Sequence, residues 1–241
     1  QTGHNAADFP VSLDDIDHIE VLEGAAARVF GSSAFSGAIN IVTSPSLPDG
    51  HKAGGHATVE GGSYGTFSGD AGASWAFVKG GAMSLSGGYA QSDGGTENAD
   101  FRKRRGFWQG GWQSSVADVS WQAGITSQDY GANTFYSARF PNQFEWTRRY
   151  MGSVRGNIRP FQTGDAALLE IVPMVYAHRD LDHYQLTKGS EGAKAGENYH
   201  RTDVYGASLS LNVDWVAGKT SAGADIRREQ IWSTAYGDLQ A

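Results

Sequence analysis

The 241-residue sequence has no cysteine, no run of about 18 apolar residues and fewer basic than acidic side chains. The missing cysteines exclude disulfide bonds, cysteine-based zinc sites and a cysteine nucleophile. The missing apolar run argues against a helical membrane protein. The formal net charge of -7 argues against a nucleic-acid partner.

Glycine and aromatic residues are abundant, with 33 Gly, 7 Trp, 10 Tyr and 11 Phe. After about residue 50 they occur in segments where apolar and polar residues alternate, as between Phe67 and Phe77, which is typical of β-strands. Pro173 is unusual within a strand because proline cannot donate a ladder hydrogen bond. The pattern predicts about nine strands, at 56–61, 67–77, 82–89, 106–113, 117–126, 150–159, 166–178, 205–215 and 221–232.

The predicted strands are near the length of about 9 to 11 residues that crosses a bilayer at a tilt. Short turns alternate with long polar segments at 91–105, 127–148 and 180–200, which is the layout of an outer-membrane barrel. A soluble β-sandwich also alternates and stays open as an alternative. Tryptophan recurs on the apolar faces, as expected of lipid-facing or interface anchors: Trp75, Trp108, Trp112, Trp121 and Trp215.

The segment before residue 45 has a different composition. Residues 19–22 and 38–43 are predicted strands, and residues 24–30 can form a short helix that ends at Gly31. Ser12 and Asp15 have capping-box spacing, which predicts another turn over 13–17. A Pro/Gly-rich breaker follows at 44–50. We therefore expect a small α+β unit over 1–44, a linker over 45–53 and a β domain over 54–241.

The small α+β unit resembles the end of the plug domain in TonB-dependent outer-membrane receptors. The matching positions have the spacing of the family run I-E-V-L-R-G-P…Y-G…G-x-I-N-I-I-T: Ile19, Glu20, Val21, Leu22, Gly24, Phe30, Gly31, Ala34, Gly37, Ile39, Asn40, Ile41 and Thr43. Segments 130–136 and 200–207 are similar to the Bacteroidetes branch, which includes receptors similar to vitamin B12 transporters.

The resemblance implies a mostly β fold, in which the C-terminal part of a plug precedes an incomplete antiparallel transmembrane β-barrel. The family barrel has about 22 strands, so a fragment is expected, without the box that contacts the TonB-type energy-coupling protein. No signal peptide is visible at Gln1. The implied location is the outer membrane of a Gram-negative bacterium, in contact with its lipid.

The function implied by the resemblance is active uptake of a scarce ligand, either a corrinoid such as vitamin B12 or an iron siderophore or haem. No enzymatic activity, cofactor or nucleic-acid partner is expected. The alternatives are a passive porin, which the plug-like stretch argues against, and a soluble β-sandwich or carbohydrate-binding module.

Candidate plug-motif residues are Glu20, Gly24, Gly31, Gly37 and Asn40. The three glycines lack the pattern G-x-x-x-x-G-K-[ST] of a phosphate loop, and tight plug turns explain them better. Many TonB-dependent receptors have an arginine at the position of Glu23, and that arginine forms ion pairs between the plug and the barrel wall. That pairing is therefore in doubt here.

The candidate ligand contacts lie in the aromatic segment 127–148, because aromatic rings provide large, stiff contact area. They are Tyr130, Asn133, Phe135, Tyr136, Phe140, Phe144 and Trp146. The alternative is a loop that packs on the plug or on its neighbours. No metal site is predicted, since His178, His183 and His200 fit no compact ligand motif. The acidic residues Asp14, Asp15 and Asp17 are interpreted as a solvated helical turn, and the basic run 102–105 as a solvated loop.

Overall fold

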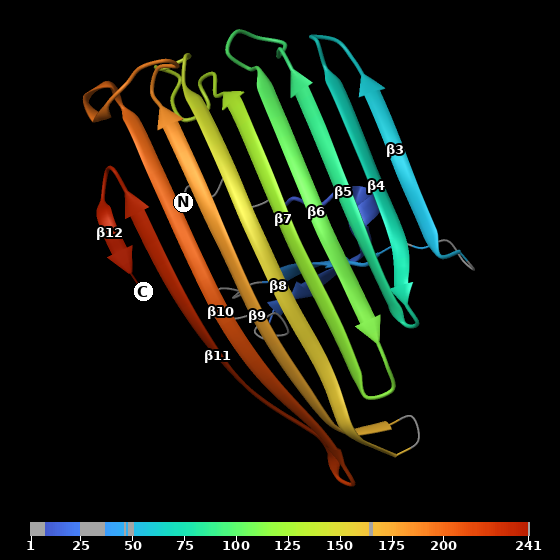
Figure 1. Ribbon diagram of the computed structural model, residues 1–241. Coiled ribbons are helices and arrows are strands. Elements are labelled where there is room, and N and C mark those ends of the chain that lie inside the picture. The colour runs from blue at the N-terminus through green and yellow to red at the C-terminus, as the bar shows by residue number, and fades with distance from the viewer. Residues whose placement is uncertain (1–7, 25–36, 46, 48–50, 164–165, 241) are drawn as a thin grey trace.

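The computed structural model describes residues 8–24, 37–45, 47, 51–163 and 166–240, which form two antiparallel sheets. The smaller sheet pairs β1 (Ile16–Glu23) with β2 (Gly37–Thr43). The larger sheet has ten strands, each hydrogen-bonded to the next in sequence order (Figure 1). No helix in the described part of the chain is long and apolar enough to span a membrane.

The ten strands form an open antiparallel sheet with β3 and β12 as its edges. The mostly β fold, with an incomplete antiparallel sheet, is therefore confirmed, and the four-residue β12 is the strand that the sequence pattern missed. The strands are β3 (Ala53–Gly61), β4 (Phe67–Val78), β5 (Gly81–Ser92), β6 (Phe101–Gln113), β7 (Ala117–Gly131), β8 (Phe144–Thr163), β9 (Ala166–Gln185), β10 (Glu197–Trp215), β11 (Gly218–Ser233) and β12 (Gly237–Gln240).

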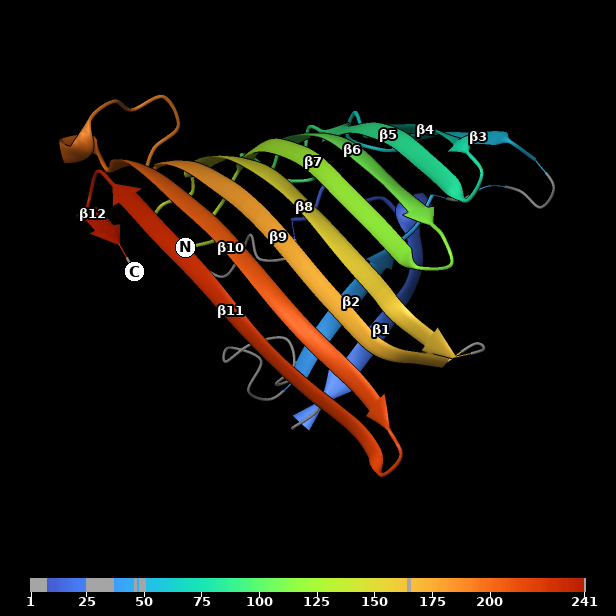
Figure 2. The ribbon, with the colours of Figure 1, turned by 60° about the horizontal axis from the view of Figure 1, so that its bottom comes forward.

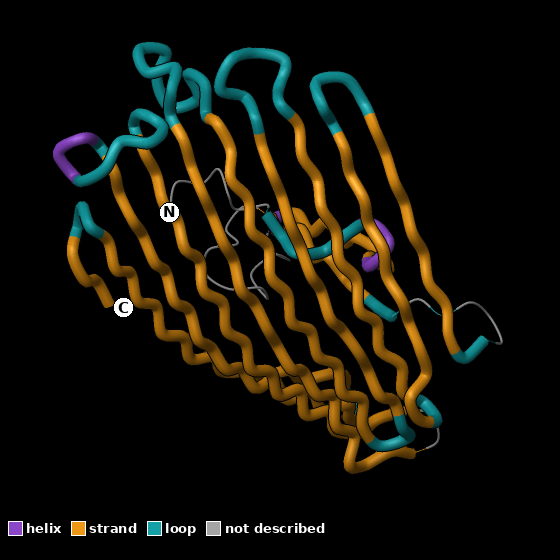
Figure 3. Tube along the Cα trace, turned by 45° about the horizontal axis from the view of Figure 1, so that its top comes forward, coloured by secondary structure: helices purple, strands orange, loops and turns teal. Residues whose placement is uncertain are grey.

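Long connections gather at one end of the sheet and short turns at the other (Figures 1 and 3). The long connections are 93–100, 132–143 and 186–196, so each is shorter than predicted. The strands continue into these polar segments because the ladder pairing persists there, as between Arg102 and Asp129. The prediction of a solvated loop at 102–105 is wrong, since this run lies in β6. Pro173 does not interrupt β9 and lies opposite Leu209.

The sheet is curved, and β1 and β2 lie on its concave side (Figure 2). We call the described residues 8–24 and 37–45 the plug, and the ten-stranded sheet the wall. Arg105 and Gln109 of β6 contact the plug, so alternate residues of that strand face it. By register, all five tryptophans predicted to face lipid lie on the opposite face, which we call the outer face.

The outer face of β10 is apolar over eleven residues. Six alternate positions from Tyr205 to Trp215 carry Tyr, Ala, Leu, Leu, Val and Trp. Tyr205, Leu209 and Trp215 are 47%, 45% and 55% exposed. This run matches the length of a transmembrane β-strand, about 9 to 11 residues.

The plug begins with η2 (Leu13–Asp15), a 3-10 turn. The N–H of Ser12 donates to Asp15 Oδ2 at 2.9 Å, which confirms the capping-box pairing. The turn ends at Asp15, so the predicted extension to Asp17 is wrong: from Ile16 the backbone is extended and pairs with β2. The predicted helix over 24–30 and Gly31 lie outside the described residues, apart from Gly24. The boundaries at 44 and 53 remain a prediction.

Candidate functional site

Asp15 joins the plug to the wall. Its side chain is 4% exposed and accepts hydrogen bonds from the Ser86 hydroxyl of β5 at 2.8 Å and from Arg105 Nη1 of β6 at 3.3 Å. A carboxylate removed from water needs such partners. The expectation that Asp15 belongs to a solvated turn is therefore wrong, although its neighbour Asp14 is exposed.

Arg105 links two carboxylates. One arm of its guanidinium contacts Asp15, and the other donates to Asp70 of β4. The side chain of Arg105 is 9% exposed, and its Nη1 also lies 3.4 Å from the carbonyl oxygen of Pro10. The rigid, forked guanidinium suits this bridging role better than a lysine would.

Further contacts extend the seam between plug and wall across β6, β7 and β8. Gln109 Nε2 donates to the Asp15 carbonyl at 3.4 Å, and Thr43 Oγ1 donates to Gln122 at 3.5 Å. Asp8 forms an ion pair with Lys103 at 2.7 Å and accepts from Arg149 Nη1 through its carbonyl at 3.0 Å. Polar contacts from residues 8–15 and from Thr43 thus hold the plug to the wall.

The described plug-motif residues stabilise the β1–β2 hairpin. Glu20 lies opposite Asn40, whose Nδ2 donates to it at 2.8 Å. This hydrogen bond, followed by one from His18, lowers the pKa of the Glu20 carboxyl. Gly24 has φ of 64°, in the region that favours glycine, and Gly37 lies opposite Glu23. Gly31 lies outside the described residues.

The long connections are tied to one another. Asn98 Nδ2 donates to the carbonyl of Gln143 at 2.6 Å, and Asn133 Nδ2 donates to that of Glu97 at 2.6 Å. Lys188 Nζ pairs with Asp100 at 3.0 Å. We call the three connections, 93–100, 132–143 and 186–196, the rim.

At the rim and next to it, on the face toward the plug, three tyrosines surround Glu145, which is 1% exposed. Tyr130 lies opposite Glu145 in register, and the Tyr136 hydroxyl donates to its carboxylate. The Tyr184 ring meets Tyr136 edge-on at 5.4 Å, and its hydroxyl donates to buried Gln143 at 3.0 Å. We call Tyr130, Tyr136, Tyr184 and Glu145 the tyrosine cluster.

The other predicted ligand contacts occupy different places. Phe135 is 57% exposed and packs edge-on against Tyr136 at 5.0 Å, while Phe140 lies under Arg139. Phe144 and Trp146 alternate with Glu145 and therefore lie on the outer face. The structure thus brings Tyr130, Phe135 and Tyr136 together, holds Asn133 in the rim and separates Phe144 and Trp146 from them.

Glu197, on the outer face, links the loop 186–196 to β9 through hydrogen bonds. Its carboxylate accepts from the N–H of Gly192 at 2.6 Å and lies 2.8 Å from His183 Nε2. The Gly192 hydrogen bond, followed by those from His183 and Tyr199, lowers the pKa of Glu197 to about 2. The loop therefore keeps this contact ionised across the physiological pH range.

Several side chains of these contacts lay outside the sequence-based interpretation: Glu145, Gln143 and Tyr184 at or next to the rim, and Asp70 at the seam. A usable signal existed in β8, where continued alternation from residue 150 back to 144 places Glu145 on the same face as Arg149. Among the described residues, Asp14, His56 and Asp70 are the one group of histidine and carboxylate side chains close enough together to hold a metal ion.

No protein-family profile and no curated protein matches the chain. Its fold is that of part of the TonB-dependent receptors. The copper transporter OprC is 18% identical, with a TM-score of 0.71 over 91% of this chain and 34% of OprC. The siderophore receptor PiuA from Acinetobacter baumannii is 12% identical, with a TM-score of 0.69 over 91% of this chain and 36% of PiuA.

The ferric citrate transporter FecA is 15% identical, with a TM-score of 0.67 over 96% of this chain and 38% of FecA. These neighbours are transporters and receptors. The chain spans a little over a third of their length, and the identities are low, so the likeness establishes the fold.

Proposed function

We propose that the chain is the plug-bearing part of a TonB-dependent receptor that takes up a scarce ligand through the outer membrane of a Gram-negative bacterium. The observation that carries the proposal is the buried Asp15–Arg105–Asp70 contact, which holds a plug on the concave face of a sheet with membrane-length strands. A TonB-type protein would supply the energy that loosens this contact, and outer-membrane lipid would surround the wall.

The tyrosine cluster is the proposed ligand contact, because it lies on the plug side at the end where the long connections gather. Its hydroxyls can donate to anionic oxygens, and its rings offer stiff apolar area. The structural neighbours OprC, PiuA and FecA are a copper transporter, a siderophore receptor and a ferric citrate transporter, which favours a metal chelate as the ligand. An iron chelate is our first candidate, and a corrinoid, suggested by segments 130–136 and 200–207, is the second.

The loop 132–143 connects ligand binding to the wall. Gln143 Nε2 donates to the carbonyls of Phe140 at 2.7 Å and Ser137 at 3.3 Å, and its Oε1 accepts from Tyr184. A ligand that displaces Tyr136 or Tyr184 would therefore release this loop as well as the Glu145 contact. Ligand binding would in this way change the conformation of the rim.

We expect replacement of Tyr136 or Tyr184 by phenylalanine to raise the Kd of the transported ligand about tenfold, since each change removes one hydroxyl donor. The measurement is a binding titration of the full-length protein in detergent with ferric citrate, a ferric siderophore, haem and cobalamin. Tyr205→Phe, on the outer face of β10, is the matched control. Equal affinities for the Tyr136, Tyr184 and Tyr205 variants would place the ligand elsewhere.

A passive porin is the less favoured reading because a plug docked by buried ion pairs occupies the concave face. A soluble β-sandwich or carbohydrate-binding module would bury the apolar outer face of β10, where Leu209 and Trp215 are exposed. The proposed receptor accounts for both observations.

A further inference from the structure

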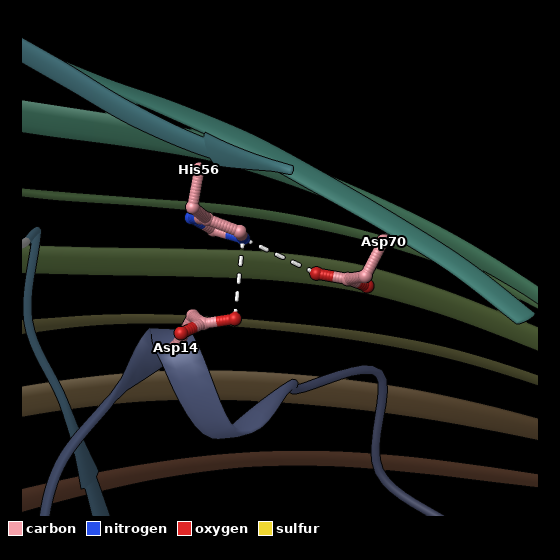
Figure 4. A group of neighbouring side chains, drawn as sticks. All are labelled: Asp14, His56 and Asp70. Atoms are coloured by element: carbon pink, nitrogen blue, oxygen red, sulfur yellow. Dashed lines mark hydrogen bonds and ion pairs between the residues drawn. The ribbon is translucent and has the colours of Figure 1, made fainter. Parts of the chain in front are cut away.

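Three side chains from separate elements converge where the plug meets the first two wall strands. Asp14 belongs to η2, His56 to β3 and Asp70 to β4 (Figure 4). Their ligand atoms all lie within 4.8 Å of one another. We propose that they bind a divalent first-row transition cation, such as Zn²⁺, which joins the plug to the wall.

The distances fit shared coordination. His56 Nε2 lies 3.5 Å from Asp14 Oδ2 and 3.2 Å from Asp70 Oδ1. Two atoms bound at about 2.1 Å to one tetrahedral ion lie roughly 3.4 Å apart. Charge-assisted hydrogen bonds are shorter, at about 2.7–2.9 Å. The 3.2 Å contact between His56 and Asp70 also has hydrogen-bond length, and the three-way spacing is compatible with an ion held between the groups.

The side chains around the proposed site carry an excess of negative charge. Asp14, Asp15 and Asp70 contribute three negative charges and Arg105 one positive charge, which leaves -2 when His56 is neutral. The side chains of Asp15, Asp70 and His56 are 4%, 22% and 31% exposed and are screened only in part, whereas that of Asp14 is 53% exposed. A divalent cation would neutralise it. One imidazole and two carboxylates are ligands that Zn²⁺ accepts.

The surroundings support the three ligands. Arg105 binds Oδ2 of Asp70 and leaves Oδ1 for the metal, the arrangement in which an outer contact orients a ligating carboxylate. Gly72 leaves room for the imidazole, because a Cβ there would lie 2.5 Å from His56 Cε1. A cavity of about 170 Å³, lined by Asp14, His56 and Gly72, gives space for a water molecule as fourth ligand.

This site lies at the seam and does not include the tyrosine cluster, so it goes beyond ligand uptake. A resident ion would tie η2 to β3 and β4, beside the Asp15–Arg105 contact. The plug would then be released by two separate events: loss of the ion and opening of the ion pair.

The test is zinc binding by the full-length protein in detergent, stripped with chelator, dialysed and titrated with Zn²⁺ alone by calorimetry and elemental analysis. We expect one equivalent in the unmodified protein. His56→Gln and Asp14→Asn should each raise its Kd at least about tenfold. Gly72→Ala, which keeps every ligand but crowds the imidazole, should also weaken binding.

Matched controls are His200→Gln, which removes a histidine elsewhere, and Gly111→Ala, where a Cβ would meet its nearest atom at an ordinary 3.6 Å. Both should bind zinc as the unmodified protein does. Zinc should also raise the thermal midpoint of the unmodified protein and leave that of the His56 variant unchanged. Equal zinc affinity with and without His56, or no bound equivalent in the unmodified protein, would overturn the proposal.

Discussion

Replacing Arg105 by alanine is expected to lower the free energy of unfolding by about 3–5 kcal/mol and to loosen the plug. The change leaves Asp15, which is 4% exposed, and Asp70 without their shared counterion. An uncompensated buried charge costs more than the pair contributes, because its hydration is lost. Denaturant unfolding measures the loss, and hydrogen exchange of residues 8–24 measures the loosening.

The matched control is Arg102→Ala, since Arg102 lies in the same basic run but alternates onto the outer face. Its effect should stay within about 0.5 kcal/mol. The plug can detach while the wall stays folded, so unfolding curves alone cannot report on the plug contact. Hydrogen exchange of residues 8–24 measures that contact directly. Unchanged exchange of 8–24 in the Arg105 variant would show that this contact does not hold the plug.

The second large effect concerns the outer face. Leu209→Arg places a charge in the middle of the apolar run of β10 and should cost about 2–4 kcal/mol if that face meets lipid. The expected result is a severe loss of folded protein in the outer-membrane fraction, measured by membrane fractionation and resistance to denaturation in detergent.

Ser208→Arg is the control for this change. Ser208 is the adjacent residue on the plug side, opposite Asp225 in register, so a new arginine there has a carboxylate within reach. It should assemble close to the unmodified level. Equal damage from both variants would mean that the two faces do not differ in environment, which contradicts a membrane wall.

The fold could be predicted from local alternation, but the strand ends could not. In segments such as 67–77 the two faces can be told apart from the sequence, because large apolar residues occur only at odd positions and Ser and Asp only at even positions. Near the rim both faces become polar, as at Arg102 and Lys103, and alternation of hydrophobicity vanishes while the ladder continues. The predicted loops were too long for that reason. Short β12 lacked the length for any pattern.

The contacts between plug and wall could not be predicted from the sequence and became visible only in the three-dimensional structure. Nothing local distinguishes Arg105 from the three basic residues before it, and its partner Asp15 is 90 residues away. The resemblance drew attention to Glu23, where the family has an arginine. In this structure the buried contact has the acidic group on the plug, at Asp15, and the arginine on the wall. An ion pair between plug and wall is thus present here, but it does not involve Glu23, and the acidic and basic partners have exchanged sides.

The aromatic segment 127–148 was predicted as one loop, but the structure divides it between β7, a shorter connection and β8. Tyr136 lies in the connection and belongs to the tyrosine cluster, and Phe135 packs against it, whereas Phe144 and Trp146 belong to β8 and lie on the outer face. Composition cannot separate these cases, because the point where a loop becomes a strand sets the face of every later side chain.

A single-cysteine scan of β10 from Thr202 to Trp215 tests most directly whether the outer face of the wall meets lipid. The sequence has no cysteine, so each introduced thiol carries the only label within these 241 residues, and any cysteine elsewhere in the full-length protein is first replaced by serine. With the full-length protein in lipid vesicles, a fluorophore at odd positions from 205 to 215 should be quenched by a lipid-attached quencher, and one at even positions should not. Quenching without this two-residue period, or strongest at the even positions, would contradict a plug-bearing membrane wall.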